Sequence, residues 1–440
     1  MIIGGGPLFT FGESNLCLAC GGIRIHDGLV TEIASFQDLK EKYPEEGIYD
    51  TKGKTILPGM TCAHHHLYST FARGISLPGD PPATFGKILE QLWWRLDKVL
   101  TLDDVYLSAL IALIECIRSG TTAILDHHAS PFAVRGSLQA IARAVEQAGI
   151  RACLCYEVSD RDGPEIAEEG ISENADFIGY TQWQCSDFLK GTFGLHASLT
   201  LSDETLRAAL AFARPLKVGF HIHAAEGPED VADSLRRSGR RVIERLDDLE
   251  ILGEKTLVAH AVHVDDHEIE LLARSGTMVA HNASSNMNNA VGFAPIPRLL
   301  EAGIPVGIGT DGMTSDLFSE LRTAFLLEKH ALADPRRGWV EVSKMFGNNT
   351  AIFSKYFDHA VGTLVPGGYA DLIVLDYHPP TPFDGDTFLG HLFFALSSRM
   401  VDSTIVGGRF LMKERQLLVL DEASLAVAAR ELSVKLWQRF

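Results

Sequence analysis

Residues 56–66 read ILPGMTCAHHH, a short apolar run that ends in three consecutive histidines. An apolar run that passes directly into polar residues is typical of a buried parallel strand with functional groups at its carboxyl end. Residues two apart in a strand face the same way, so we expect His64 and His66 to share one side and His65 to face the other. This stretch therefore predicts the first strand of a barrel, with two imidazoles at its mouth.

Seven further runs of this kind follow, and longer stretches with helical periodicity separate them. They are TTAILDHH (121–128), RACLCYEV (151–158), GTFGLHA (191–197), KVGFHIHAAE (217–226), TLVAHAV (256–262), GTMVAHN (276–282) and PVGIGTD (305–311). Thr101 and Gly120 predict the start and stop of a helix over 102–119, and further helices are expected over 134–148 and near 203–213. Eight strands that alternate with helices favour an α/β fold, a (β/α)8 barrel of the TIM type, over an open doubly wound sheet.

The two chain ends have a different pattern. IRIHDGLVTEIASF (23–36) has a hairpin signal at Asp27-Gly28, and near the other end GTLVPGGYADLIVLDY (362–377) and STIVGGRFLMK (403–413) contain Gly-Gly turns. We therefore predict a small β-sandwich domain composed of residues 1–55 and 363–440, with the barrel of residues 56–362 inserted between them. An amphipathic helix is expected near 421–438, within the second of these segments.

Composition and charge restrict the class of protein. Of the 440 residues 46% are hydrophobic and 22% charged, as in an ordinary globular protein. The formal net charge of −18 disfavours contact with phosphate backbones and anionic lipid, so we expect no nucleic acid and no membrane as partner. Seven cysteines are too few for a disulfide scaffold, which indicates reduced thiols and a cytoplasmic location.

Two cysteine pairs could in principle carry chemistry. Cys17 and Cys20 form a CxxC, the spacing of redox pairs and of half a zinc site. The sequence has no second CxxC, and the pair lies in an apolar stretch that resembles a strand. We therefore expect these thiols, like those of Cys153 and Cys155, to be buried and inert.

Histidine is the most informative residue type. Eleven of the 17 lie at or near the carboxyl ends of the predicted barrel strands, where active sites of such barrels are found: His64, His65, His66, His127, His128, His196, His221, His223, His260, His263 and His281. A catalytic zinc takes about three protein ligands and an open position. His64, His66 and one histidine of the fifth strand can supply the nitrogens, and Asp311 can add an oxygen or hold the water.

These residues resemble a known family. Residues 58–66 resemble the opening PGxxxxHxH motif of the amidohydrolase superfamily, and His223-Ala224-Ala225-Glu226 is similar to the HxxE of its mononuclear chlorohydrolase and deaminase branch. Later landmarks match in order at 259–263, 284–286, 309–312 and 362–372. Within that branch, residues 92–97, 126–130 and 388–392 most resemble the SsnA-type aminohydrolases.

The resemblance implies a role for each matching position. His64, His66, His223 and Asp311 would bind one divalent metal, Zn²⁺ first and Fe²⁺ as the alternative. Glu226 would move protons, and His260 would polarise the water or the tetrahedral oxygen, with Asp311 also serving in catalysis. The fourth strand, GLHASLT, lacks the lysine that bridges two metals in dinuclear relatives, which argues for a single ion.

Three further residues are candidate substrate contacts. His196 falls where the family often contacts substrate. His128 is a contact or a partner that orients a ligand, and Trp93 belongs to the long connection 67–100, which is either a lid or a packing excursion.

The expected activity is hydrolytic deamination of an amino-substituted N-heterocycle of purine, pyrimidine or pteridine type. The alternative at the same site is removal of chloride or an alkylamine from a triazine-like ring, or hydrolysis of a cyclic amide. A catalytically inactive scaffold protein is disfavoured because all four ligands and Glu226 are present. As partners we expect a small heterocyclic substrate and a second copy of the chain in a homodimer.

Overall fold

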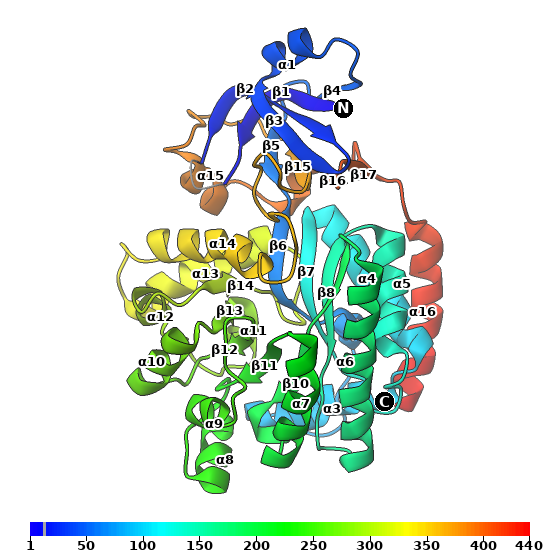
Figure 1. Ribbon diagram of the computed structural model, residues 1–440, viewed down its shortest axis with the longest axis vertical. Coiled ribbons are helices and arrows are strands. Elements are labelled where there is room, and N and C mark those ends of the chain that lie inside the picture. The colour runs from blue at the N-terminus through cyan, green and yellow to red at the C-terminus, as the bar shows by residue number, and fades with distance from the viewer. Residues whose placement is uncertain (12–14) are drawn as a thin grey trace.

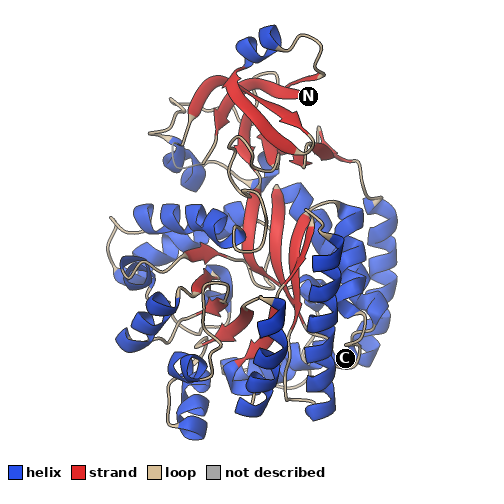
Figure 2. Cartoon of the chain, viewed as in Figure 1, coloured by secondary structure: helices blue, strands red, loops and turns tan. Residues whose placement is uncertain are grey.

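The computed structural model describes residues 1–11 and 15–440 and has two parts, a barrel and a smaller β-domain (Figure 1). Parallel strands surrounded by helices form the barrel (Figure 2). Its strands are β6 (Met60–His65), β7 (Thr121–His128), β8 (Arg151–Tyr156), β10 (Phe193–Ala197), β11 (Phe220–Ala224), β12 (Leu257–His260), β13 (Met278–His281) and β14 (Val306–Ile308). Each corresponds to one of the eight predicted runs, and the predicted fold class is confirmed.

The barrel strands form two hydrogen-bonded sheets that meet at both edges. The first holds β6, β7, β8 and the short β9 (Leu189–Gly191), and the second runs from β10 to β14. A parallel bridge between Val158 and Leu195 joins them on one side, and a bridge between His65 and Asp311 joins them on the other. The second bridge lies at the carboxyl ends of the first and last strands, so closing the barrel also brings Asp311 beside the histidines of β6.

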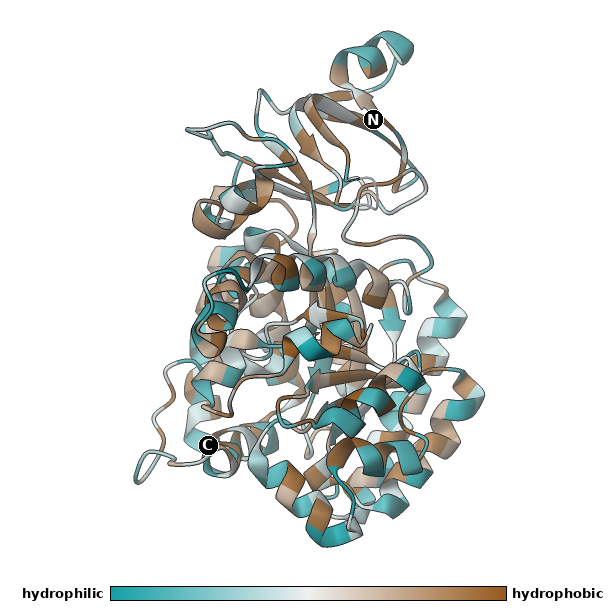
Figure 3. Cartoon of the chain, turned by 90° about the vertical axis from the view of Figure 1, so that its left-hand side faces the viewer, coloured by the Kyte–Doolittle hydropathy of each residue, from teal (hydrophilic) through white to brown (hydrophobic). Residues whose placement is uncertain are grey.

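One predicted helix matches at both ends, while α5 (Ser137–Ala148) begins three residues later than predicted and α7 (Asp203–Leu216) ends three residues later. Helix α4 (Leu102–Ser119) starts with a capping box between Thr101 and Asp104 and ends at Gly120, whose φ of 81° suits glycine. The remaining barrel helices are α6 (Pro164–Gln184), α8 (Pro228–Ser238), α9 (Val242–Asp248), α10 (Asp266–Ser275), α11 (Ala283–Asn288), α12 (Ile296–Glu301), α13 (Leu317–Leu332) and α14 (Trp339–Phe353). In Figure 3 they show both hydrophilic and hydrophobic colours, as expected when one face of a helix is buried.

Both chain ends contribute strands to the β-domain. Its sheet has the order β18-β17-β16-β15-β5-β1-β2-β3, with β4 beside β1. The strands are β1 (Ile2–Phe9), β2 (Cys17–His26), β3 (Leu29–Ser35), β4 (Ile48–Asp50), β5 (Thr55–Pro58), β15 (Leu372–Leu375), β16 (Val401–Val406), β17 (Arg409–Lys413) and β18 (Gln416–Leu417), with helices α1 (Phe36–Lys42) and α15 (Phe388–Phe394). The β2–β3 hairpin turns at Asp27 and Gly28, both with positive φ, as predicted.

The predicted first run, 56–66, divides between the two parts. Ile56 to Pro58 pair with β15 in the β-domain, and the barrel strand begins at Met60. Gly59 lies between them, and a Cβ there would come within 2.1 Å of the Thr122 hydroxyl. Only glycine therefore allows the chain to pass this close to β7 as it leaves one sheet for the other.

The C-terminal helix α16 (Glu422–Arg439) packs along the barrel, although the sequence groups it with the β-domain (Figure 1). Arg118 of α4 donates to Glu422 at 2.9 Å, and Arg439 pairs with Asp104. The Trp437 indole donates to the Phe71 carbonyl at 2.8 Å. The helix thus supports the connection that leads into the pocket.

The prediction that four of the cysteines are buried is correct for two of them. Cys153 and Cys155 are buried in β8 as predicted, but Cys17 is only half-buried and Cys20 is exposed on β2. The first four residues of β2 are all half-buried or exposed, so this end of the strand has solvent on both faces. Separately, among the described residues no helix is long and apolar enough to cross a membrane.

Candidate metal centre and active site

Three imidazoles are held so that one nitrogen of each faces a common point. The Nδ1–H of His66 donates to the His127 carbonyl at 2.5 Å, and that of His223 donates to the His196 carbonyl at 2.7 Å. A carbonyl can only accept, so in both neutral rings the proton is on Nδ1 and Nε2 has a free lone pair.

In His64 the proton is also on Nδ1, which follows from the contacts of His221. The Cys155 thiol donates to the Asp126 carbonyl, so its sulfur accepts from His221 Nδ1 at 3.9 Å. His221 Nε2 then accepts from His64 Nδ1 at 2.8 Å.

The free nitrogens are at the spacing of ligands on one ion. His66 Nε2 lies 3.2 Å from His223 Nε2 and 3.0 Å from Asp311 Oδ1, and His64 Nε2 lies 3.9 Å from that oxygen. Two neutral rings that meet lone pair to lone pair at 3.2 Å repel unless a proton or a metal ion lies between them. Two nitrogens that are each about 2.0–2.1 Å from one zinc ion have a separation of this size.

The buried His64 supplies a further test of whether a metal fits. Its ring is fully buried, and its Nε2 has no hydrogen-bond partner among the described residues. Such an atom is costly unless something binds it. Three neutral imidazoles and one carboxylate form the donor set of a divalent metal, so the cluster fits the ion that the sequence predicts.

Backbone strain places the carboxylate of the cluster. Asp311 has a φ of 54°, in the left-handed region, and its amide donates to the His64 carbonyl at 3.0 Å. The Ser285 hydroxyl donates to Asp311 Oδ2 at 2.5 Å, which leaves Oδ1 directed at the imidazoles. Residues in such conformations persist where the surrounding structure requires them, commonly at functional sites.

Glu226 lies beside this cluster of imidazoles and Asp311. Its Oε2 is 3.4 Å from His260 Nε2, and its Oε1 accepts a hydrogen bond from Asn289 at 3.3 Å. Burial raises the pKa of the Glu226 carboxyl to about 7; His260 acts against this rise and the Asp311 carboxylate adds to it. A carboxyl with this pKa can both give and take a proton at neutral pH.

Hydrogen bonds also fix the groups that support Glu226. Asp230 accepts from the Ala225 amide at 2.6 Å and so holds the turn between His223 and Glu226, where Ala225 has a φ of 53°. His260 Nδ1 lies 2.8 Å from Asn286 Oδ1, so its Nε2 lone pair points toward Glu226 and Asp311.

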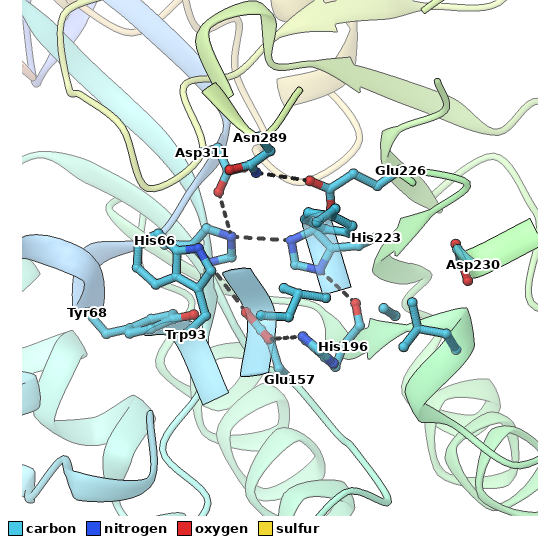
Figure 4. Close-up of a pocket in the computed structure, with 14 residues that line it drawn as sticks. His66, Tyr68, Trp93, Glu157, His196, His223, Glu226, Asp230, Asn289 and Asp311 are labelled. Carbon is cyan, nitrogen blue, oxygen red and sulfur yellow. Dashed lines mark hydrogen bonds and ion pairs between the residues drawn. The ribbon is translucent and has the colours of Figure 1, made fainter. Parts of the chain in front are cut away.

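The pocket has a polar wall and an aromatic wall (Figure 4). The strand ends contribute the polar wall, which includes His66, His223, Glu226 and Asp311. The aromatic wall comes from the connection 67–100, which consists of η1 (Leu67–Ala72), α2 (Phe85–Ile88), the π-helical η2 (Leu89–Trp93) and α3 (Trp94–Val99). From this connection Tyr68, Phe85, Leu89 and Trp93 line the pocket.

The structure brings together most of the predicted site residues. His64, His66, His223, Asp311, Glu226 and His260 lie in one cluster, and His196 and Trp93 line the pocket. His128 is different, because it is fully buried, its Nε2 lies 2.9 Å from Ser130 Oγ, and it is absent from the pocket lining. His65 faces away from the cluster and lies 3.1 Å from Ser315 Oγ.

Glu157 is one of the pocket residues that sequence reasoning missed, together with Tyr68, Phe85, Leu89, Asp230 and Asn289. It follows β8 directly, is 3% exposed, and lies 3.4 Å from His66 Nδ1, 3.3 Å from His127 Nδ1 and 3.5 Å from His196 Nε2. The signal was available, because Glu157 is the polar residue at the end of the run 151–158. It was missed because only histidines were considered at most of the strand ends.

Comparison with known proteins gives relatives along the whole chain. A 5′-deoxyadenosine deaminase of Methanosarcina mazei is 33% identical over 95% of this chain and 94% of its own. A solved adenosine deaminase from Xanthomonas campestris with bound zinc superposes with a TM-score of 0.84, at 23% identity over 99% and 98% of the chains. A solved atrazine chlorohydrolase from Arthrobacter aurescens, in complex with zinc, gives 0.81 at 22% identity over 98% and 99%.

A closed barrel with imidazoles and a carboxylate converging at its strand ends defines a metal-dependent hydrolase. The amidohydrolase family model matches residues 55–411, and the chain belongs to the amidohydrolase family. It is a hydrolase of carbon–nitrogen bonds in the deaminase and chlorohydrolase branch, with a divalent metal site in its histidine cluster.

Proposed function

We propose that the protein uses one Zn²⁺, held by His64, His66, His223 and Asp311, to remove the amino group from a purine-type or related N-heterocycle as ammonia. One observation carries this proposal: a carboxyl with a pKa of about 7, Glu226, lies beside a cluster of metal-ligand type. The deaminase names of the full-length relatives support the same reaction. The mixed nitrogen and oxygen donors suit zinc, with Fe²⁺ as the alternative.

Each residue near the reacting carbon has a task. A divalent ion at this position lowers the pKa of a water toward about 7 and so supplies the nucleophile. Protonated Glu226 donates to the ring nitrogen next to the amino-bearing carbon, which makes that carbon electrophilic. His260 Nε2 lies 3.4 Å from Glu226 Oε2 and 3.7 Å from Asp311 Oδ2, where its lone pair can accept the proton of the Glu226 carboxyl.

The pocket walls hold the ring for this transfer. Trp93, Phe85 and Tyr68 offer flat faces on one side, and the strand ends offer polar groups on the other. Burial excludes bulk water, which strengthens the interactions of Glu226 with the substrate. The three stretches that resemble SsnA-type aminohydrolases support membership of that subgroup.

The test is ammonia release from a panel of amino-substituted purines, pyrimidines, pteridines and triazines, with purified protein and its metal content determined in parallel. We expect ammonia from at least one amino-heterocycle and about one metal ion per chain. Chloride or alkylamine release from triazines without ammonia would contradict deamination and support the alternative reaction.

A further inference from the structure

We propose that Glu157 and His196 form a pair of hydrogen-bond acceptors that binds a ring N–H of the substrate, on the side of the pocket away from Glu226. The site would then select a free heterocyclic base and reject the same ring when that nitrogen carries an alkyl group or a sugar. This inference rests on the proposed function and specifies the substrate class of the same site.

The hydrogen bonds of Thr200 determine which nitrogen of His196 can accept. The Thr200 hydroxyl has one proton, which it donates to the Ala197 carbonyl at 3.0 Å. Its oxygen must therefore accept from His196 Nδ1, which lies 2.7 Å away. The proton of the neutral ring is thus on Nδ1, and the Nε2 lone pair faces the pocket.

The contact between His196 and Glu157 is not itself a hydrogen bond. His196 Nε2 and Glu157 Oε2 are 3.5 Å apart, whereas an imidazolium–carboxylate hydrogen bond has a length of about 2.7–2.9 Å. Two acceptors therefore face one another at the pocket surface. A donor placed between them would satisfy both.

The other oxygen of Glu157 gains no donor from its neighbours. His66 Nδ1, at 3.4 Å, already donates to the His127 carbonyl. The Nε2–H of His127 donates to the His221 carbonyl at 3.0 Å, so in the neutral ring its Nδ1, 3.3 Å from Glu157 Oε1, is also an acceptor. Glu157 is buried and its Oε1 has no hydrogen-bond partner among the described residues, so a donor from the pocket stabilises the carboxylate strongly.

Position decides which part of the substrate supplies the donor. Ligand atoms of Glu157, His196 and His223 lie within 4.8 Å of one another, so the acceptor pair adjoins an imidazole of the metal cluster. At that distance it reaches the reacting ring and not a substituent beyond the ring. Figure 4 places Glu157 and His196 on one side of His66 and His223, with Glu226 and Asn289 on the other. The ring nitrogen opposite Glu226 is therefore the one that must carry hydrogen.

The experiment compares matched ring pairs on the metal-loaded enzyme. Adenine, whose N9 lies opposite the N1 that Glu226 would protonate, is measured against its N9-methyl and N9-ribosyl counterparts for ammonia release. Purine and 9-methylpurine, which have no amino group to lose, are measured by calorimetry for binding. We expect the N–H compound to be favoured at least about 100-fold in kcat/KM and to bind more tightly, because the substituted ring leaves a buried carboxylate unpaired.

Three variants separate recognition from folding. Glu157→Gln keeps the shape but adds a donor, and should reduce the preference for N–H to within about tenfold. Thr200→Val removes the hydroxyl that sets the His196 tautomer and should also weaken the preference, while Thr200→Ser retains it. The Ser variant is the matched control, since both substitutions alter a residue that is 6% exposed.

Several results would overturn the inference. They are nucleosides favoured over bases, an unchanged preference in Glu157→Gln, equal or no binding of purine and 9-methylpurine, or a second metal ion per chain that Glu157→Gln removes. If no base releases ammonia but purine still binds more tightly than 9-methylpurine, deamination is disproved and the acceptor pair is supported. The two proposals can thus fail separately.

Discussion

The strand-end wall of the pocket and the wall formed by residues 67–100 hold their side chains in different ways. On the strand side, His66 and His223 each donate to a main-chain carbonyl, and these carbonyls belong to the rigid barrel. On the other side, Tyr68 and Trp93 come from short helical segments whose aromatic faces pack without such bonds to the cluster. From this difference we expect the strand ends to carry out the reaction and residues 67–100 to position the substrate ring, and mutations on the two walls should have different effects.

The largest effect is expected on the strand side, from loss of a ligand. His64→Ala or Asp311→Ala should remove most of the metal, because each takes one donor from a set of four. Loss of a residue that only hydrogen-bonds to a metal ligand lowers metal affinity by about 10–100-fold, so loss of a ligand itself should lower it by more than about 100-fold. Turnover should fall with it. Elemental analysis beside steady-state rates measures both. Full metal occupancy in either variant would contradict the ligand set.

Glu226→Gln should separate the metal from proton transfer. The amide preserves the shape and the contact with Asn289 but gives up no proton, so turnover should fall by about 10²–10⁴-fold while metal content stays at the wild-type level. The same two measurements apply. Metal loss equal to that of Asp311→Ala would show that Glu226 is a ligand and not a proton carrier.

The pH dependence follows from the raised pKa of Glu226. If the protonated carboxyl is the active form, its population falls about tenfold per pH unit above the pKa of about 7. kcat/KM should therefore be level below about pH 7 and decline above it. A profile of kcat/KM against pH at constant metal loading measures this. A rate that rises across pH 7–9 would reverse the assigned role.

His221→Phe tests whether strand histidines act through one another. His221 is buried and accepts from His64 Nδ1, so its loss frees the ligand ring to rotate. Metal affinity should fall by about 10–100-fold, less than for a ligand itself. Competition with a chelator measures it. His267→Ala, at an exposed histidine on α10, is the control and should leave metal affinity unchanged.

The smallest effect is expected on the aromatic wall. Trp93→Ala should raise KM by about 2–10-fold, the value of one aromatic contact, without changing metal content. Trp183→Ala is the control, since Trp183 is 80% exposed on α6. If Trp93→Ala lost metal, the two walls would not be separable, and the comparison would fail.

The barrel could be predicted from local pattern because each strand and helix marks its own limits. Apolar runs that end in polar residues located all eight strands, and Thr101 and Gly120 located α4. The division of 56–66 at Gly59 was not predicted, since the apolar pattern continues across it. The packing of α16 on α4 was not predicted either. An amphipathic pattern indicates that one face of a helix is buried, but it does not identify the element that covers that face.

For the site, the sequence by itself determined the residue types and their positions at strand ends, which follow from alternation along each strand. It could not determine which atoms meet. The ring tautomers of His66 and His223 depend on carbonyls of other strands, 61 and 27 residues away along the chain, whereas that of His196 depends on Thr200, four residues on. Only barrel closure brings the carbonyls of other strands within hydrogen-bonding distance, because they are far from these rings along the chain.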